Sequence, residues 1–147
     1  MKVKLDINDS YIEPEIVIKA SKIDDDIKKI LNIASKEEKS DYIMGFVDDR
    51  MVVLNVLEII RVYTKAGRVV AECIQGNFEL KLRLYEAEEA LERFGFVRIS
   101  KSEIINLKHI AFFETEITGS LMVVFKNKEK SYVSRRYVKC IKERIGV

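Results

Sequence analysis

Apolar and polar residues alternate with a period of two along much of the chain after residue 41, which is the pattern of strands with one buried face. The clearest stretch is 78–84, where Phe and Leu alternate with Glu, Lys and Arg. We predict a strand here, with its apolar side chains in the core. The same criterion predicts further short strands at 43–47, 51–54, 56–63, 68–74, 96–99, 104–107, 110–117, 121–125 and 131–133.

A helical spacing of apolar residues occurs in three places. Three aspartates begin the first, at 23–34, whose expected inward face is Ile23, Ile27, Ile30, Leu31 and Ala34. The second, at 85–93, carries Ala87, Ala90 and Leu91 inward and ends near Gly95. Ser134 suits the N-cap of the third, whose inward residues are Val138, Ile141 and Ile145.

The chain divides into two parts on this reading. The pattern of residues 1–20 predicts two short strands, because Val3, Leu5 and Ile7 alternate with polar residues and an apolar run follows Pro14. With the first helix they form a β-β-α segment at 1–38. The highly charged residues 36–40 are the expected linker to a β-rich domain at 41–147. The predicted class is mostly β, and α+β overall.

Composition narrows the function classes. The 147 residues include no apolar run of the roughly 20 needed to cross a bilayer, and the start of the chain lacks a signal-peptide pattern, so we expect a cytoplasmic protein. Cys73 and Cys140 are expected to be core thiols, and the single His109 has no partner for a metal site. Because no acid–base pair or nucleophile stands out, we expect no enzyme, no cofactor, no metal and no small-molecule substrate.

Charge is distributed unevenly along the chain. From Val97 to Val147 eleven Lys and Arg residues stand against five Glu, a net charge of +6, whereas the whole chain has a net charge of only +2. The first 96 residues therefore carry a net charge of −4. Cations near Ser residues in the last third indicate a surface for phosphates and base edges.

Nine residues in this last third form an ordered pattern: Phe96, Arg98, Ser102, Ile105, Asn106, Ile110, Ser134, Arg135 and Arg136. The pattern resembles that of the LytTR family of bacterial transcription regulators, and the resemblance covers about residues 41–147. It implies a mostly antiparallel β-fold with three sheets and no helix-turn-helix. It also implies a sequence-specific, response-regulator-like DNA-binding protein that docks loops into major grooves.

The resemblance carries expectations about partners. Family members bind direct repeats in promoter DNA as pairs of protomers, so we expect a homodimer on double-stranded DNA. With about forty residues before the β domain, the chain is similar to the short, stand-alone members without a receiver domain. Those members are often paired with a small membrane protein that inhibits them.

Three loops supply the DNA contacts in related domains. In the first, Lys65 or Arg68 could reach phosphate, although Gly67 occupies the position that often carries a polar reader and could serve only the turn. In the second, Lys101 could donate to guanine or remain solvated, and Ser102 could bind phosphate or cap the local backbone. Glu103 could tune specificity or orient Lys101, and we expect Asn106 to be structural.

The third loop is Ser134, Arg135 and Arg136, leading to Lys139. Arg136 matches the base-reading arginine of the family, and Arg135 and Lys139 suit phosphates. The alternative is a solvated helix face. The rival function is a protein-interaction module or anti-activator that docks a membrane partner. We expect the N-terminal segment to mediate dimerisation or a regulatory contact.

Overall fold

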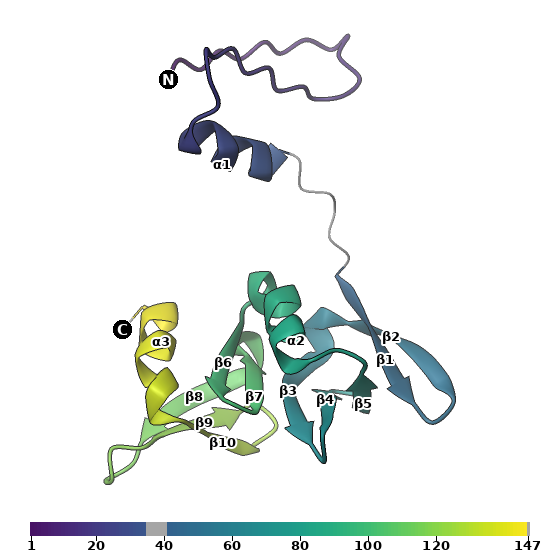
Figure 1. Ribbon diagram of the computed structural model, residues 1–147, viewed down its shortest axis with the longest axis vertical. Coiled ribbons are helices and arrows are strands. Elements are labelled where there is room, and N and C mark those ends of the chain that lie inside the picture. The colour runs from purple at the N-terminus through teal and green to yellow at the C-terminus, as the bar shows by residue number, and fades with distance from the viewer. Residues whose placement is uncertain (35–40, 147) are drawn as a thin grey trace. The chain divides into compact units, whose positions relative to one another are not determined.

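The computed structural model describes residues 1–34 and 41–146 (Figure 1). The chain separates into two compact units, Met1–Lys39 and Ser40–Val147, which are described one at a time. The expected linker at 36–40 lies outside the described residues.

Within residues 1–34, the described part of the first unit, the chain forms one helix, α1 (Asp25–Ala34). The Asp24 carboxylate caps it by accepting a hydrogen bond from the Ile27 amide at 2.9 Å, so the acidic run does begin a helix. Of the expected inward face only Ile27 is buried, and Ile23 is mostly exposed.

The two strands predicted before α1 are wrong, since residues 1–24 contain only turns, bends and extended chain. The chain doubles back around a turn in which the Tyr11 amide donates to the Asn8 carbonyl at 3.1 Å (Figure 1). Alternation of apolar and polar residues indicates which side chains would share one face of a strand, but a strand also needs a hydrogen-bonded neighbour. Pro14, which lacks an N–H, weakens the nearest candidate.

The second unit is built of strands and two α-helices. Its strands are β1 (Tyr42–Val47), β2 (Arg50–Asn55), β3 (Ile59–Lys65), β4 (Arg68–Cys73), β5 (Gly76–Leu80), β6 (Phe96–Ser100), β7 (Glu103–Asn106), β8 (Ile110–Thr115), β9 (Leu121–Phe125) and β10 (Lys130–Val133). Its α-helices are α2 (Leu84–Leu91) and α3 (Arg135–Ile145), and three short 3-10 helices are η1 (Val56–Glu58), η2 (Glu92–Phe94) and η3 (Leu107–His109).

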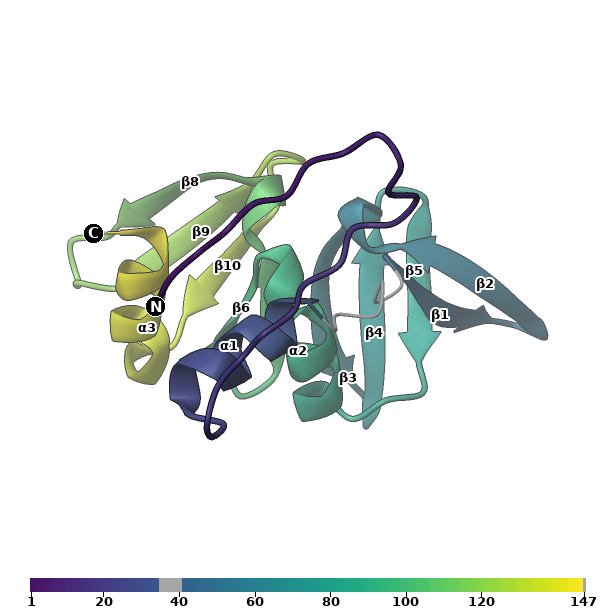
Figure 2. The same ribbon diagram turned by 90° about the horizontal axis from the view of Figure 1, so that it is seen from above.

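All strand pairs are antiparallel and form two sheets. The larger has seven strands in the order β2-β1-β5-β4-β3-β7-β6, and the smaller has the order β10-β9-β8. The mostly β class is confirmed. The expected third sheet is not separate among the described residues, because the β1–β2 hairpin joins the larger sheet through the single pair Phe46 and Glu79. Figure 2 shows this hairpin at the end of the unit opposite to β8 and α3.

Two cores lie on opposite faces of the larger sheet. In one core, α2 residues such as Ala87 and Leu91 pack with Ile104. In the other core, β9 and the α3 residue Ile141 pack with Ile105. Adjacent residues of β7 thus point into different cores, which gives the continuous apolar run expected of a strand covered on both faces. The layers are α2, the larger sheet, and then the smaller sheet with α3.

Some local predictions differ from the structure. The stretch 78–84 is not one strand, because β5 ends at Leu80 and Leu84 begins α2. The stretch 56–63 begins with η1 rather than with a strand. Ala90 is exposed on α2, and Cys140 is exposed on α3, so it is not a core thiol. Cys73 is buried, and burial raises the pKa of its thiol to about 12.

Two asparagines end strands in the same way. Asn55 caps η1 through the Leu57 amide, and Asn106 caps η3 through the Lys108 amide, both at 3.0 Å. Asn106 is 1% exposed, and its Nδ2 also donates to the Ile59 carbonyl at 2.8 Å. The structural role expected for Asn106 is therefore confirmed, because its amide joins β7 to β3.

Replacing Asn106 by alanine should lower the free energy of unfolding by about 2–3 kcal/mol, because it leaves a buried carbonyl without a donor as well as removing a cap. The matched change Asn55→Ala removes an exposed cap and should cost about 1 kcal/mol or less. Urea unfolding of both variants measures the difference. Equal losses would contradict the cross-strand role of Asn106.

Candidate nucleic-acid interface

The three loops singled out in the sequence lie together at one end of the second unit. The Thr64 amide at the end of β3 donates to the Ser102 carbonyl in the β6–β7 turn at 2.9 Å. The Ser134 amide before α3 donates to the Ile99 carbonyl in β6, also at 2.9 Å. These bonds bring the β3–β4 turn, the β6–β7 turn and the start of α3 to the lower side of the unit in Figure 1.

Most of the cations on these loops form no ion pair with another described residue. The ion pairs among the described residues engage Arg61, Arg68, Arg98 and Arg144. All predicted contact cations are exposed, and of these only Arg68 has a carboxylate partner, Glu79 at 3.3 Å. Among the predicted contact cations, those without a carboxylate partner in the described part of the chain are Lys65, Lys101, Arg135, Arg136 and Lys139. Their charges are available to an anion.

The first loop is a two-residue hairpin turn. Ala66 and Gly67 have positive φ values of 51° and 74°, and Lys65 pairs directly with Arg68 across the turn. Two consecutive positive φ values define the primed turn that matches strand twist, and glycine favours it. Gly67 therefore adopts the backbone conformation that the turn requires. Lys65 and Arg68 flank the turn as a cross-strand pair.

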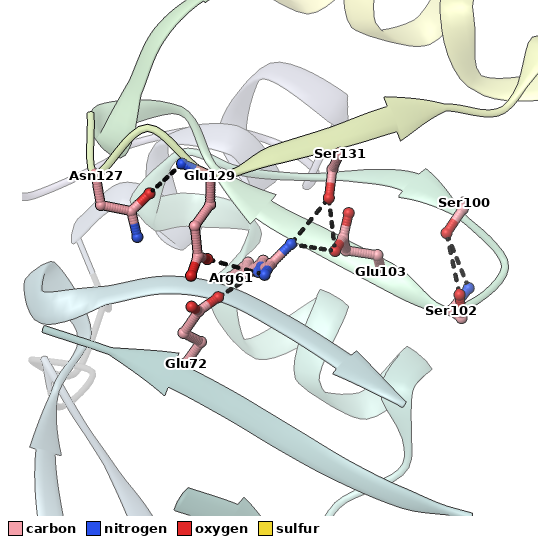
Figure 3. Close-up of polar contacts among 8 residues, drawn as sticks. All are labelled: Arg61, Glu72, Ser100, Ser102, Glu103, Asn127, Glu129 and Ser131. Atoms are coloured by element: carbon pink, nitrogen blue, oxygen red, sulfur yellow. Dashed lines mark hydrogen bonds and ion pairs between the residues drawn. The ribbon is translucent and has the colours of Figure 1, made fainter. Parts of the chain in front are cut away.

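The β6–β7 turn is held from inside by Arg98. Its Nε donates to the Ser100 carbonyl at 2.7 Å, and its Nη2 donates to the Lys101 carbonyl. The remaining guanidinium nitrogen, Nη1, donates to the Glu88 carboxylate on α2 at 2.8 Å. The turn is further closed by the Ser102 amide, which donates to the Ser100 hydroxyl at 3.2 Å (Figure 3). The hydroxyl that caps the local backbone is therefore that of Ser100, whereas the Ser102 hydroxyl lies 3.3 Å from the Ser100 hydroxyl.

The role of Arg98 was missed in the sequence, where it counted only as a cation and a pattern residue. An arginine two residues before a strand end can turn back onto the following carbonyls, and this spacing was the available signal. The consequence is a fixed backbone beneath the Lys101 side chain, which leaves only that side chain to be ordered when it binds.

The third loop begins α3. Ser134 is the N-cap residue, as predicted, although its side chain makes no capping bond. The Tyr137 amide donates to the Ser134 carbonyl at 2.8 Å, so the amides of Arg135 and Arg136 are the ones at this helix start that are suited to an anion. The Arg136 guanidinium carbon lies 5.9 Å from the centre of the Tyr137 ring. This cation–π contact leaves the guanidinium N–H groups free to donate.

Glu103 does not orient Lys101, contrary to one expectation. Its Oε1 accepts hydrogen bonds from Arg61 at 3.2 Å and from the Ser131 hydroxyl at 3.0 Å (Figure 3). Arg61 also pairs with Glu72 and, at 3.0 Å, with Glu129. One guanidinium thus connects β3, β4 and β7 of the larger sheet to β10 and the turn before it.

Burial and charge act in opposite directions in this Arg61 cluster, defined as Arg61, Glu72, Glu103, Glu129 and Ser131. Burial raises the pKa of Glu72, a hydrogen bond with Glu129 raises it further, and Arg61 only partly offsets both. Burial alone would lower the pKa of Arg61, but the carboxylates outweigh it and raise that pKa. Arg61 therefore stays charged.

Other classes of site find little support in the described ranges 1–34 and 41–146. They contain no group of three or more His, Cys, Asp or Glu residues arranged to hold a metal ion. None of their helices is long and apolar enough to cross a membrane. The exposed cations on the three loops remain the strongest candidate.

Comparisons with known proteins point to a DNA-binding domain. The family model described as the LytTr DNA-binding domain matches residues 49–146. Over 147 residues the chain is 37% identical to proteins named "Uncharacterized HTH-type transcriptional regulator" from Staphylococcus aureus strains NCTC 8325 and COL, covering 100% of this chain and 99% of each relative. The described residues nevertheless contain no helix-turn-helix, since five strands separate α2 from α3.

A solved structure has the same fold. It is the LytTr DNA-binding domain of a methyl-accepting/DNA response regulator from Bacillus cereus, with a TM-score of 0.69 and 18% sequence identity. The match covers 74% of this chain and 99% of that domain. At this identity the likeness concerns the fold of the second unit.

The Arg61 cluster predicts a pH dependence of stability. Because the pKa of Glu72 is higher in the folded chain, the folded state binds more protons than the unfolded state above the ordinary Glu value of about 4.3. The free energy of unfolding should therefore fall, relative to Glu72→Gln, as the pH rises from about 4 toward neutrality. Urea unfolding at a series of pH values checks this, with Glu89→Gln as the control. A difference that is constant with pH would contradict it.

Proposed function

The chain belongs to the LytTr DNA-binding domain family, whose model matches residues 49–146, and on this premise we propose that it is a transcription regulator that binds specific sequences in double-stranded DNA. This is a family of DNA-binding domains and not of enzymes. The observation that supports the proposal is the grouping of three exposed, cation-bearing loops at one end of a rigid β scaffold.

The three loops make two kinds of contact with DNA, to base edges and to phosphates. Lys101 and Arg136 read base edges in the major groove, where both can donate to guanine O6 and N7. Arg136 does so with a fixed fork, whereas Lys101 acts as a single charge. The phosphate contacts come from Lys65, Arg68, Ser102, Ser134, Arg135 and Lys139, which fix the register of the protein on the duplex.

Binding to two direct repeats in promoter DNA, one protomer to each, completes the proposal. Three loops from one protomer cover a single short site, and two tethered protomers gain avidity from adjacent sites. The dimer is a homodimer of this chain. A small membrane protein that contacts the N-terminal unit is the proposed source of regulation.

The direct test is selection of a duplex sequence from a random pool by the full chain, followed by fluorescence anisotropy with the selected and a scrambled duplex. The selected sequence should bind at least about 1,000-fold more tightly, and affinity should fall steeply with salt. A salt-insensitive interaction, or none, together with capture of a membrane partner would instead support the protein-interaction module.

Arg136→Ala and Lys139→Ala should have different effects on DNA binding. Loss of a bidentate base contact should cost about 1–3 kcal/mol on the selected duplex and relax the preference at one base pair. Loss of a phosphate contact at Lys139 should weaken every duplex alike and reduce the salt slope by about 1. Anisotropy titrations with single-base variants measure both. Uniform losses from both substitutions would contradict the assignment of Arg136.

Arg98→Lys should weaken DNA binding without removing a DNA contact. Lysine keeps the charge but cannot bind Glu88 and two turn carbonyls together, so the Lys101 turn becomes mobile and affinity should fall by about 3- to 10-fold. The salt slope should not change. Arg50→Lys, at the exposed start of β2, is the control. An affinity loss no larger than that of Arg50→Lys would contradict the positioning role of Arg98.

A further inference from the structure

The first unit exposes nearly all of its apolar side chains. Val3, Leu5 and Ile7 are 81%, 85% and 88% exposed, and among the described residues 1–34 only Ile27 is a buried apolar residue. These three residues alternate with Lys2, Lys4 and Asp6, so in an extended chain they share one face. A chain that exposes one such face, and the backbone beside it, is suited to pairing with another strand.

The stretch 2–8 is able to pair along its whole length. It contains neither proline nor glycine, so every backbone N–H is present, and it forms no strand ladder among the described residues of its own unit. The other extended stretch of the unit, 12–18, is interrupted by Pro14. A partner for 2–8 must therefore supply a continuous strand edge.

The charges on 2–8 select a second copy of the same stretch in one register. Antiparallel pairing with Leu5 opposite Leu5 of the second copy places Lys4 opposite Asp6, Val3 opposite Ile7 and Lys2 opposite Asn8. A shift by two residues in one direction sets Lys4 against Lys4, which offsets the Lys2–Asp6 pairs of that register, and the opposite shift sets Asp6 against Asp6 and leaves Lys4 opposite Asn8. Parallel in-register pairing also opposes Lys4 with itself. Like charges directly opposite are unfavourable, whereas unlike charges are favourable.

We propose that the chain dimerises through antiparallel pairing of residues 2–8 with residues 2–8 of a second copy, about a two-fold axis at Leu5. The pairing gives strand hydrogen bonds to a stretch that forms no ladder among the described residues, and it places six apolar side chains on one face. Asp6 can still accept from the Tyr11 hydroxyl, at 2.8 Å, through its other oxygen. An interface of this kind is isologous, so each contact occurs twice.

This inference adds a specific surface to the proposed dimer, but it does not depend on DNA. The dimer is measured without nucleic acid, and affinity for a duplex with a single site is measured separately. Loss of the dimer with single-site binding retained, or the reverse, distinguishes failure of the inference from failure of the proposed function.

Charge reversal in the full chain tests the register. By analytical ultracentrifugation, Lys4→Asp and Asp6→Lys should each raise the dimer dissociation constant by about tenfold, because each opposes two pairs of like charges. The double variant Lys4→Asp/Asp6→Lys recreates the pairing in the opposite sense and should restore the dimer. Lys22→Asp, outside the paired stretch, is the control. A monomeric wild-type chain, or a double variant that is no better than the single ones, overturns the proposal.

Cysteine cross-linking tests the two-fold axis independently. In a Cys140→Ser background, Leu5→Cys should form an intermolecular disulfide, because residues opposite on antiparallel strands have Cα atoms about 4.5–5.5 Å apart. Ile7→Cys is equally exposed but lies about 13 Å along the strand from its own copy, so it should cross-link far more slowly. Equal rates for the two variants overturn the register.

Discussion

The Arg61 guanidinium is the interaction on which the arrangement of the three loops depends. It lies between the two sheets and binds carboxylates from β4, β7 and the turn before β10, as well as the Ser131 hydroxyl. Its carbon is also 5.4 Å and 5.3 Å from the centres of the Tyr63 and Phe125 rings. Apolar packing alone would let the sheets slide, because it is not directional, whereas a guanidinium with several partners has a defined geometry.

The cationic side chains of the second unit therefore have two separate roles. Arg61 and Arg98 are paired and partly buried, and they fix the strands and turns beneath the surface. Lys101 and Arg136 are exposed and have no carboxylate partner among the described residues, so their charges remain available. A ligand then meets positioned backbones and free cations, and little ordering of the loops opposes binding.

Most short strands and turns of the second unit could be predicted from local pattern, because alternation and turn chemistry act over a few residues. The errors occurred where a neighbouring element decided the outcome. Leu84 continues the alternation of β5 but begins α2, since the Arg83 amide donates a hydrogen bond to the Glu86 carboxylate at 3.1 Å. Cys140 was expected in the core, yet it lies on the exposed face of α3.

The sequence by itself determined the family, the mostly β class and the loops that carry cations, because these follow from local patterns and residue types. Only the tertiary structure decided which cations are free. Arg98 and Glu103 look like surface charges in the sequence, but strand pairing brings each to partners that are distant along the chain, Glu88 and Arg61. Distances between such partners depend on sheet order and register, which no local pattern encodes.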